Sequence, residues 1–132
     1  MALRDYSEDD DFFDQGFAQE GVVSVWLSTH DFKDSDPRID TLQDLCGVGY
    51  YRLDEQDNNH CDFQLTSAAA LLADLSFSAS YGDAVIAAAA QKGITQAYGV
   101  TVQHNFAYDP ARVTRPIARD PVFIGVFSYS VD

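Results

Sequence analysis

Basic residues are scarce in this chain of 132 residues, which has 8 lysines and arginines against 21 aspartates and glutamates. The net charge of −13 at pH 7 repels a phosphate backbone, so the composition argues against direct binding to DNA or RNA. An acidic surface keeps a protein soluble, and it also speeds association with a basic protein. The charge alone therefore leaves two interpretations open, solubility and attraction to a basic partner.

Targeting signals and cysteine motifs are also missing. No run of about 18 apolar residues occurs, so no membrane-spanning helix is predicted. Residues 1–14 have neither the positive start nor the apolar run of a secretory signal, and we expect a cytoplasmic protein. The only cysteines, Cys46 and Cys61, match no zinc or redox spacing. In the reducing cytoplasm we expect both to be free thiols in the core.

Catalytic signatures are absent from the sequence as well. It has no glycine-rich phosphate loop, no nucleophile-elbow motif and no histidine pair at metal-ligand spacing. The acidic stretch 54–59, expected to be an exposed loop, lacks the central glycine and closing glutamate of a calcium site. A Cys61–His104 dyad can be imagined, but no third group is evident to orient it. We therefore predict no catalytic residue, no metal and no cofactor.

Alternating side-chain patterns predict a sheet. Residues 94–108 alternate between large apolar and small or polar side chains, as expected for a long strand with one buried face and one that meets water or a partner. Residues 122–129 predict a second strand, which we expect to be its antiparallel neighbour. Residues 21–28 are β-branched and aromatic and predict a central strand, with Trp26 in the core.

Helical periodicity and turn signals account for the remaining elements. The first predicted helix begins at Asp36, which can cap free N–H groups, with Pro37 in its first turn, and it ends at Gly47. A second covers residues 67–75, and a third follows a capping box at 80–83 and ends at Gly93. Short strands are expected at 50–53 and 61–65. These elements predict an α+β fold, a small, mainly antiparallel sheet of about four strands with helices packed on one face.

The first twenty residues differ in composition from the rest. Their acids are Asp5, Glu8, Asp9, Asp10, Asp11, Asp14 and Glu20, against the single base Arg4. We predict an acidic N-terminal arm over 1–20, flexible or loosely docked, ahead of a single domain over 21–132. Alternatively, the phenylalanines of the arm, Phe12, Phe13 and Phe17, anchor it while the acids face a basic partner.

Five stretches, taken in order, resemble a known family. They are Val23-Ser-Val-Trp26-Leu, Asp44-Leu-Cys-Gly-Val-Gly-Tyr-Tyr51, Ser78-Ala-Ser-Tyr-Gly-Asp83, Ala97 through Phe106-Ala-Tyr108-Asp109, and Phe123-Ile-Gly-Val-Phe-Ser-Tyr129. Their order resembles the immunity protein 22 family of bacterial polymorphic toxin systems, over residues 22–130. The chain departs from this family in two places, because the arm lies outside the match and a short loop with the Pro37 helix replaces a longer acidic helix.

The resemblance implies a small cytosolic protein that binds and neutralises a cognate toxin and has no catalytic motif. We expect a monomer or a homodimer. The net charge predicts a basic toxin, such as a nuclease, whose positive functional surface the protein would cover. Tyr50 and Tyr51 are candidate anchors because they adjoin acidic residues, and interface hot spots are often aromatic. The candidate toxin-binding residues are Tyr50, Tyr51, Asp54, Glu55, Asp57, Asp40 and Asp44. A second candidate surface is the small polar face of the long strand, at Thr101, Gln103 and Asn105.

A different class of function also has a sequence basis. His104 lies on the apolar face of the predicted long strand, and Arg112, Arg115 and Arg119 follow in the next loop. Such residues could form an anion or substrate pocket, so a small enzyme or ligand-binding domain is the alternative. Simple pairing of these arginines with the acidic surface would equally explain them.

Overall fold

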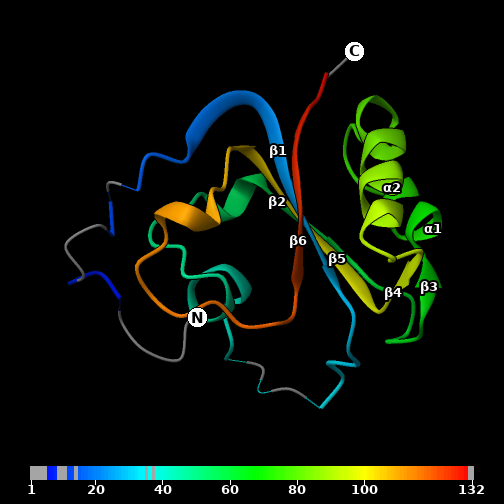
Figure 1. Cartoon of the computed structure of the whole chain (residues 1–132), viewed down its shortest axis with the longest axis horizontal. Helices are drawn as coiled ribbons and strands as arrows, with labels where there is room; N and C mark the ends of the chain where they lie inside the picture. Colours follow the sequence, from blue (N-terminus) through cyan, green and yellow to red (C-terminus); the bar gives the residue numbers. More distant parts are fainter. Residues whose placement is uncertain (1–5, 9–11, 14, 35, 37, 131–132) are drawn as a thin grey trace.

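The computed structural model describes residues 6–8, 12–13, 15–34, 36 and 38–130, and it has an α+β fold (Figure 1). The main sheet is antiparallel, with strand order β2-β5-β1-β6. Its strands are β1 (Ala18–Ser28), β2 (Gln56–Asn59), β5 (Gly99–Phe106) and β6 (Val122–Ser128). A separate two-stranded sheet pairs β3 (Thr66–Ser67) with β4 (Gln96–Ala97). The predicted fold class and the central position of residues 21–28 are confirmed.

Two α-helices pack on one face of the main sheet. They are α1 (Ala68–Ala73) and α2 (Gly82–Gln91), and they cover the apolar side chains of β1 and β5 (Figure 1). Ser67 caps α1 by accepting a hydrogen bond from the Ala70 amide at 3.2 Å. The predicted capping box before α2 is wrong, because the Ser80 hydroxyl instead donates to the carbonyl of Phe77 at 2.7 Å.

The opposite face of the sheet is also covered, although we expected it to meet water or a partner. Its core gathers Trp26, Leu42, Cys46 and other side chains from the N-terminal segment and the loops. The predicted first helix is reduced to the π-type turn Thr41–Leu45, which Asp40 caps instead of Asp36. This turn and the segments around it lie on the side of the sheet away from α1 and α2 (Figure 1).

The alternation of the predicted long strand reverses at Asn105, opposite a bulge in the β1–β5 pairing between Ala18 and Val23 of β1. Asn105 has a left-handed backbone, with φ of +57°. Before it, His104 pairs with Val23 on the helix-covered face, and after it Phe106 packs with Trp26 on the other face. The same predicted strand also breaks at residue 98, so that β4 and β5 belong to different sheets. A β-bulge turns a side chain to the other face without ending the strand.

Strand neighbours are the part of the fold where prediction fails most. β5 and β6 are not paired, because β1 lies between them. The expected strands at 50–53 and 61–65 are absent from the structure, where residues 61 and 64 form only an isolated bridge. The polar stretch 56–59, expected to be a loop, is the edge strand β2. Polar side chains of this strand are hydrogen-bonded to the neighbouring strand. For example, the Asn58 side chain accepts from the Thr101 hydroxyl at 2.7 Å.

The end of the N-terminal arm is joined to the rest of the chain. β1 begins at Ala18, inside the predicted arm, and the buried Gln15 amide donates to the Gly47 carbonyl at 2.9 Å. The Tyr50 amide donates to the Phe12 carbonyl at 2.8 Å. Several residues on which the predictions rely, namely Arg4, Asp5, Asp9, Asp10, Asp11, Asp14 and Pro37, lie outside the described residues.

The two cysteines occupy different environments. Cys46 is buried in the core behind the π-type turn, as predicted, whereas Cys61 is exposed, so that part of the prediction is wrong. Both are free thiols. No helix in the described part of the chain has the length and apolar character to cross a bilayer.

Candidate functional site

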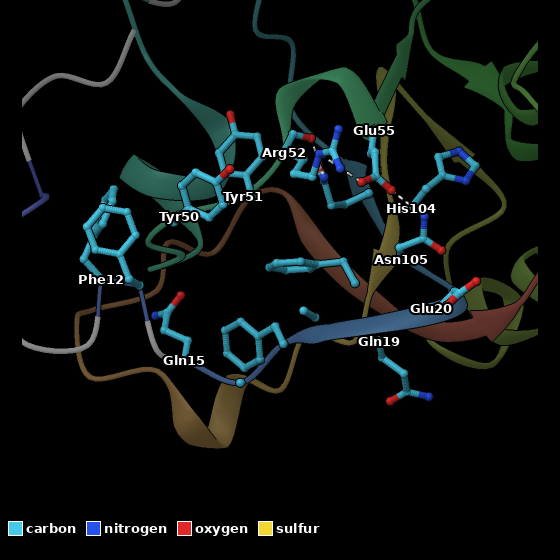
Figure 2. Close-up of a pocket in the computed structure, with 16 residues that line it drawn as sticks. Phe12, Gln15, Gln19, Glu20, Tyr50, Tyr51, Arg52, Glu55, His104 and Asn105 are labelled. Carbon is cyan, nitrogen blue, oxygen red and sulfur yellow. Dashed lines mark hydrogen bonds and ion pairs between the residues drawn. The ribbon is translucent and has the colours of Figure 1, made fainter.

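A groove of about 670 Å³ lies between the N-terminal segment and the segment that follows the π-type turn. Figure 2 shows Tyr50, Tyr51 and Arg52 on one side of it and Gln15 and Glu20 on the other. The end of β5, residues 103–106, also lines it. A concave site of this size is within the range of known ligand and anchor pockets. We call it the main groove.

Large apolar side chains stand exposed in the main groove, at Phe13 and Tyr50, and in the adjoining turn, at Leu53. Phe13 is 73% exposed, Tyr50 is 56% exposed and Leu53 is 69% exposed. The rings of Phe13 and Tyr50 contact each other, with centroids 5.7 Å apart. Burying such side chains against a partner would be favourable, at about 25 cal/mol for each Å² of apolar surface removed from water. Apolar surface rimmed by polar groups is typical of interaction sites.

Carboxylates border these apolar side chains. Arg52 contacts Asp54, with Nη2 and Oδ2 2.8 Å apart, and Glu55, with Nε and Oε1 3.3 Å apart. The hydrogen bond from Arg52 holds the pKa of the Asp54 carboxyl below its usual range. Because this pair is exposed to solvent, it contributes little to stability. Arg52 fixes the position of both carboxylates while leaving this short segment with a net negative charge.

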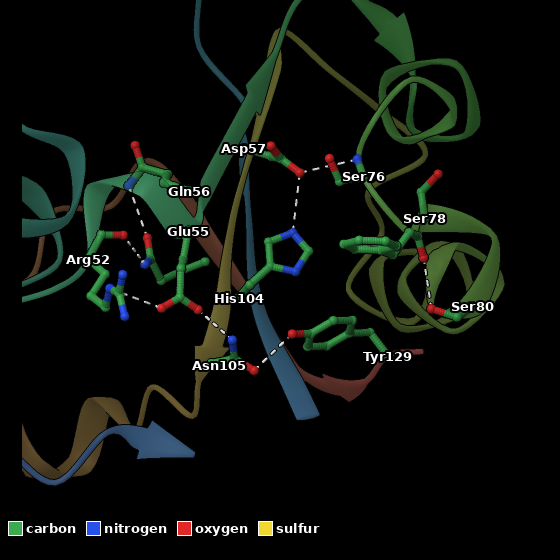
Figure 3. A network of polar contacts seen from close by, with 12 residues as sticks. Arg52, Glu55, Gln56, Asp57, Ser76, Ser78, Ser80, His104, Asn105 and Tyr129 are labelled. Atoms are coloured by element: carbon green, nitrogen blue, oxygen red, sulfur yellow. Dashed lines mark hydrogen bonds and ion pairs between the residues drawn. The ribbon is translucent and has the colours of Figure 1, made fainter. Parts of the chain in front are cut away.

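A polar network joins the acidic segment to the bulge in β5 (Figure 3). The Asn105 side chain donates to Glu55 and accepts from the Tyr129 hydroxyl at 2.8 Å and from the Gly21 amide at 3.0 Å. One amide side chain therefore connects the acidic segment with β1 and the residue that follows β6. In this left-handed conformation the Asn105 side chain reaches all three partners, so the network stabilises the bulge.

Asp57 faces a different direction from Glu55. Its Oδ2 lies 3.2 Å from Nε2 of His104 and accepts from the Ser76 amide at 3.1 Å (Figure 3). His104 is 8% exposed. Asp57 thus links β2, β5 and the loop between α1 and α2, and it does not line the main groove.

The other predicted toxin-binding residues, Tyr51, Asp40 and Asp44, form hydrogen bonds within the protein. The Tyr51 hydroxyl donates to Oδ2 of Asp40 at 2.6 Å, and burial followed by this hydrogen bond raises the pKa of Tyr51. Asp44 accepts from the Tyr6 hydroxyl at 2.7 Å and from the Asp40 amide at 2.8 Å. The structure therefore brings Tyr50, Tyr51 and Glu55 to the groove, with Asp54 in the adjoining turn. It places Asp40 and Asp44 in the hydrogen bonding of the π-type turn.

The second predicted surface is not exposed. Thr101 is 6% exposed and Gln103 is 1% exposed, and the Gln103 side chain donates to the Arg52 carbonyl at 2.8 Å. Loops that pack on this face of the sheet cover both residues. Gln103 and Asn105 both line the main groove, whereas Thr101 does not.

The residues of the predicted enzyme pocket do not meet. Arg112 contacts the Gly16 carbonyl at 3.4 Å and Arg115 donates to the Val48 carbonyl at 2.7 Å, and the exposed Arg119 does not line the main groove either. Cys61 follows the end of β2 that pairs with Val100, so it lies about 20 Å along β5 from His104. Neither the dyad nor the arginine pocket is assembled. Among the described residues, no three His, Cys, Asp or Glu side chains gather to hold a metal ion.

Some residues of the site gave no signal in the sequence. Leu53 stands in a segment whose pattern predicts a strand, and nothing indicates that it is exposed. Asn105 is a left-handed residue within an alternating strand, and asparagine tolerates that conformation better than most residues, which is a weak indication of a bulge. For Phe13, the sequence indicates only that it can anchor the arm.

Comparison of the chain with protein-family models, with curated proteins and with solved structures finds no match. The resemblance to the immunity protein 22 family therefore stays a prediction. The groove, its apolar rim and the acidic segment beside it are the observations from which a function can be inferred.

Proposed function

We propose that this protein is an immunity protein that binds a basic bacterial toxin and neutralises it by covering the toxin's positively charged functional surface. The observation that carries the proposal is the juxtaposition, at the main groove, of exposed apolar side chains with fixed carboxylates. Phe13 and Tyr50 provide the apolar part and Glu55 the charge, and the adjoining turn adds the exposed Leu53 and the carboxylate of Asp54. The resemblance to immunity proteins supports the same conclusion.

Charge and apolar contact would act at different stages of binding. The net charge of −13 attracts a basic toxin over long range and raises the rate of encounter. Affinity then depends on a few side chains that become fully buried in the complex, and aromatic residues are enriched among these. Tyr50 suits this role because its ring is already positioned against Phe13 and loses little freedom on binding.

Co-expression tests the proposal directly. The toxin domain encoded beside this gene is expressed with and without this protein, cell survival is scored, and the pair is then purified together. Survival with a stable complex is the expected result. The mechanism of inhibition is wrong if the bound toxin is acidic, or if its active site stays open to substrate in the complex.

Two variants separate the apolar contribution from the charge. Tyr50→Ala should weaken the complex by about 2 kcal/mol, mainly through faster dissociation. Asp54→Lys should slow association at low salt, and the difference from the parent protein should shrink as salt is added. Asp31→Lys, on an exposed loop after the far end of β1, is the matched control for net charge. Equal slowing by both lysine variants would show that the acidic segment has no local role.

A further inference from the structure

A smaller cleft of about 230 Å³ lies on the other side of the acidic segment from the main groove. Four parts of the chain converge on it, namely the segment entering β2, the end of β5, the loop between α1 and α2, and the residue that follows β6. The residues on which the argument rests are Asp54, Glu55, Asp57, Phe77, His104 and Tyr129. We call it the side cleft.

The side cleft is lined by carboxylates, and no lysine or arginine stands among the described residues of its wall. Arg52 contacts Asp54 and Glu55 from outside it and leaves a net negative charge. Oδ2 of Asp57 is engaged by His104 and Ser76, whereas its Oδ1 accepts no hydrogen bond from the described residues. The wall therefore offers an acceptor that a cationic donor could use without breaking an existing contact.

Aromatic rings form the opposite wall. Phe77 is 45% exposed, and its ring contacts that of Tyr129, with centroids 6.0 Å apart and the ring planes inclined by 28°. The backbone of Phe77 is left-handed, with φ of +61°, which is unfavourable for a bulky residue. Contact with water does not stabilise an apolar ring that is exposed at the surface beside carboxylates. It suits a cation, which is attracted to the ring face and to the carboxylates together.

We propose that the side cleft binds the guanidinium group of an arginine from the toxin. A planar guanidinium can stack on an aromatic ring while donating to Asp57 Oδ1 and to the neighbouring carboxylate, whereas a lysine ammonium makes only point contacts. The identity of the partner rests on the proposed function, but the preference for a guanidinium is a property of this chain alone. The side cleft would add specificity to the apolar contact at the main groove.

The preference is tested on the full chain alone. Arginine amide is titrated into labelled protein beside citrulline amide, whose urea side chain is a neutral isostere of the guanidinium, and the backbone amide signals of Asp57, Phe77 and His104 are followed by NMR. Saturable shifts with arginine amide, and none at matched concentrations of citrulline amide, are expected. Equal binding of the two compounds overturns the proposal, as does the absence of saturable shifts with arginine amide.

Matched variants assign the binding to the side cleft. Asp57→Asn should weaken arginine amide about tenfold, and Phe77→Leu about threefold. Asp31→Asn removes the same charge from a distant exposed loop and should have less than about a twofold effect. Arg52→Gln should strengthen binding, because it frees the two carboxylates. If Asp57→Asn behaves like Asp31→Asn, the proposal is wrong. If Asp57→Asn fails to fold, the affinities of Phe77→Leu and Arg52→Gln for arginine amide decide the test.

The toxin complex distinguishes this inference from the proposed function. If Asp57→Asn and Phe77→Leu weaken both arginine amide and the neighbouring toxin, both proposals stand. If they weaken arginine amide but leave toxin affinity unchanged, the side cleft is not a toxin contact, although the immunity function holds. If no toxin complex forms with the parent protein, the proposed function fails and the arginine amide titration alone decides the guanidinium site.

Discussion

Replacement of Asn105 tests the part of the fold on which both clefts depend. Asn105→Ala removes three hydrogen bonds, to Gly21, Tyr129 and Glu55. At a net value of about 1 kcal/mol each, their loss costs about 3 kcal/mol. Alanine also tolerates the left-handed backbone less well than asparagine, which adds about 1 kcal/mol. We expect Asn105→Ala to lower the free energy of unfolding by about 4 kcal/mol.

Two companion variants separate these contributions. Asn105→Gly loses the same hydrogen bonds but accepts a φ of +57° without strain, so it should cost about 1 kcal/mol less than alanine. Tyr129→Phe removes one hydrogen bond and should cost about 1 kcal/mol. The double variant Asn105→Ala/Tyr129→Phe should cost no more than Asn105→Ala alone, because the two residues share that bond.

Urea unfolding followed by the fluorescence of Trp26 measures these changes. Trp26 is the only tryptophan and is 1% exposed, so its signal reports loss of the core. A glycine variant as unstable as the alanine variant would refute the backbone part of the reasoning. Additive costs of Asn105→Ala and Tyr129→Phe would refute the hydrogen bond between them.

Further predictions concern buried hydroxyl and thiol groups. The Tyr81 hydroxyl is buried without a hydrogen-bond partner in the described part of the chain, whereas that of Tyr108 donates to the Cys46 carbonyl at 2.6 Å. In urea unfolding, Tyr81→Phe should therefore be neutral or stabilising, and Tyr108→Phe should cost about 1 kcal/mol. Burial raises the pKa of both tyrosines and of Tyr51, so the unfolded chain releases these protons first. Stability is then fully present below about pH 10 and falls above it, by about 1.4 kcal/mol per pH unit for each tyrosine, in urea titrations at rising pH. Burial, with smaller effects of nearby carboxylates, raises the pKa of the Cys46 thiol to about 12, whereas Cys61 is exposed. A thiol reagent should modify one cysteine of the native protein quickly and the second only on unfolding, and rapid modification of both would contradict the burial of Cys46.

The features that were predictable from the sequence are those that short stretches control. Apolar, β-branched side chains identify residues 21–28 as a central strand, because such a run can only be buried on both faces. The helix that ends before Gly93 follows from local periodicity and from the ability of glycine to adopt φ of +78° there. Net charge is fixed by composition, and the proposal of a basic partner rests on it.

The candidate site depends on contacts that no local pattern encodes. Tyr50 and Tyr51 are adjacent in sequence with similar side chains, yet the first is exposed at the main groove and the second bonds Asp40. The difference arises because the N-terminal segment binds the Tyr50 amide through Phe12 and leaves its ring outside. That distant segment therefore decides which ring of the pair stays exposed.

Sequence by itself determined the α+β class, the central strand, the acidic surface and the absence of recognisable catalytic motifs. Tertiary structure alone decided that β1 separates β5 from β6, that polar residues 56–59 form an edge strand, and that Asn105 turns β5 at the two clefts. The physical reason is that strand pairing and bulges are stabilised by partners far away in the chain. A segment's own side chains can favour an extended backbone, but they do not specify which neighbour it will pair with.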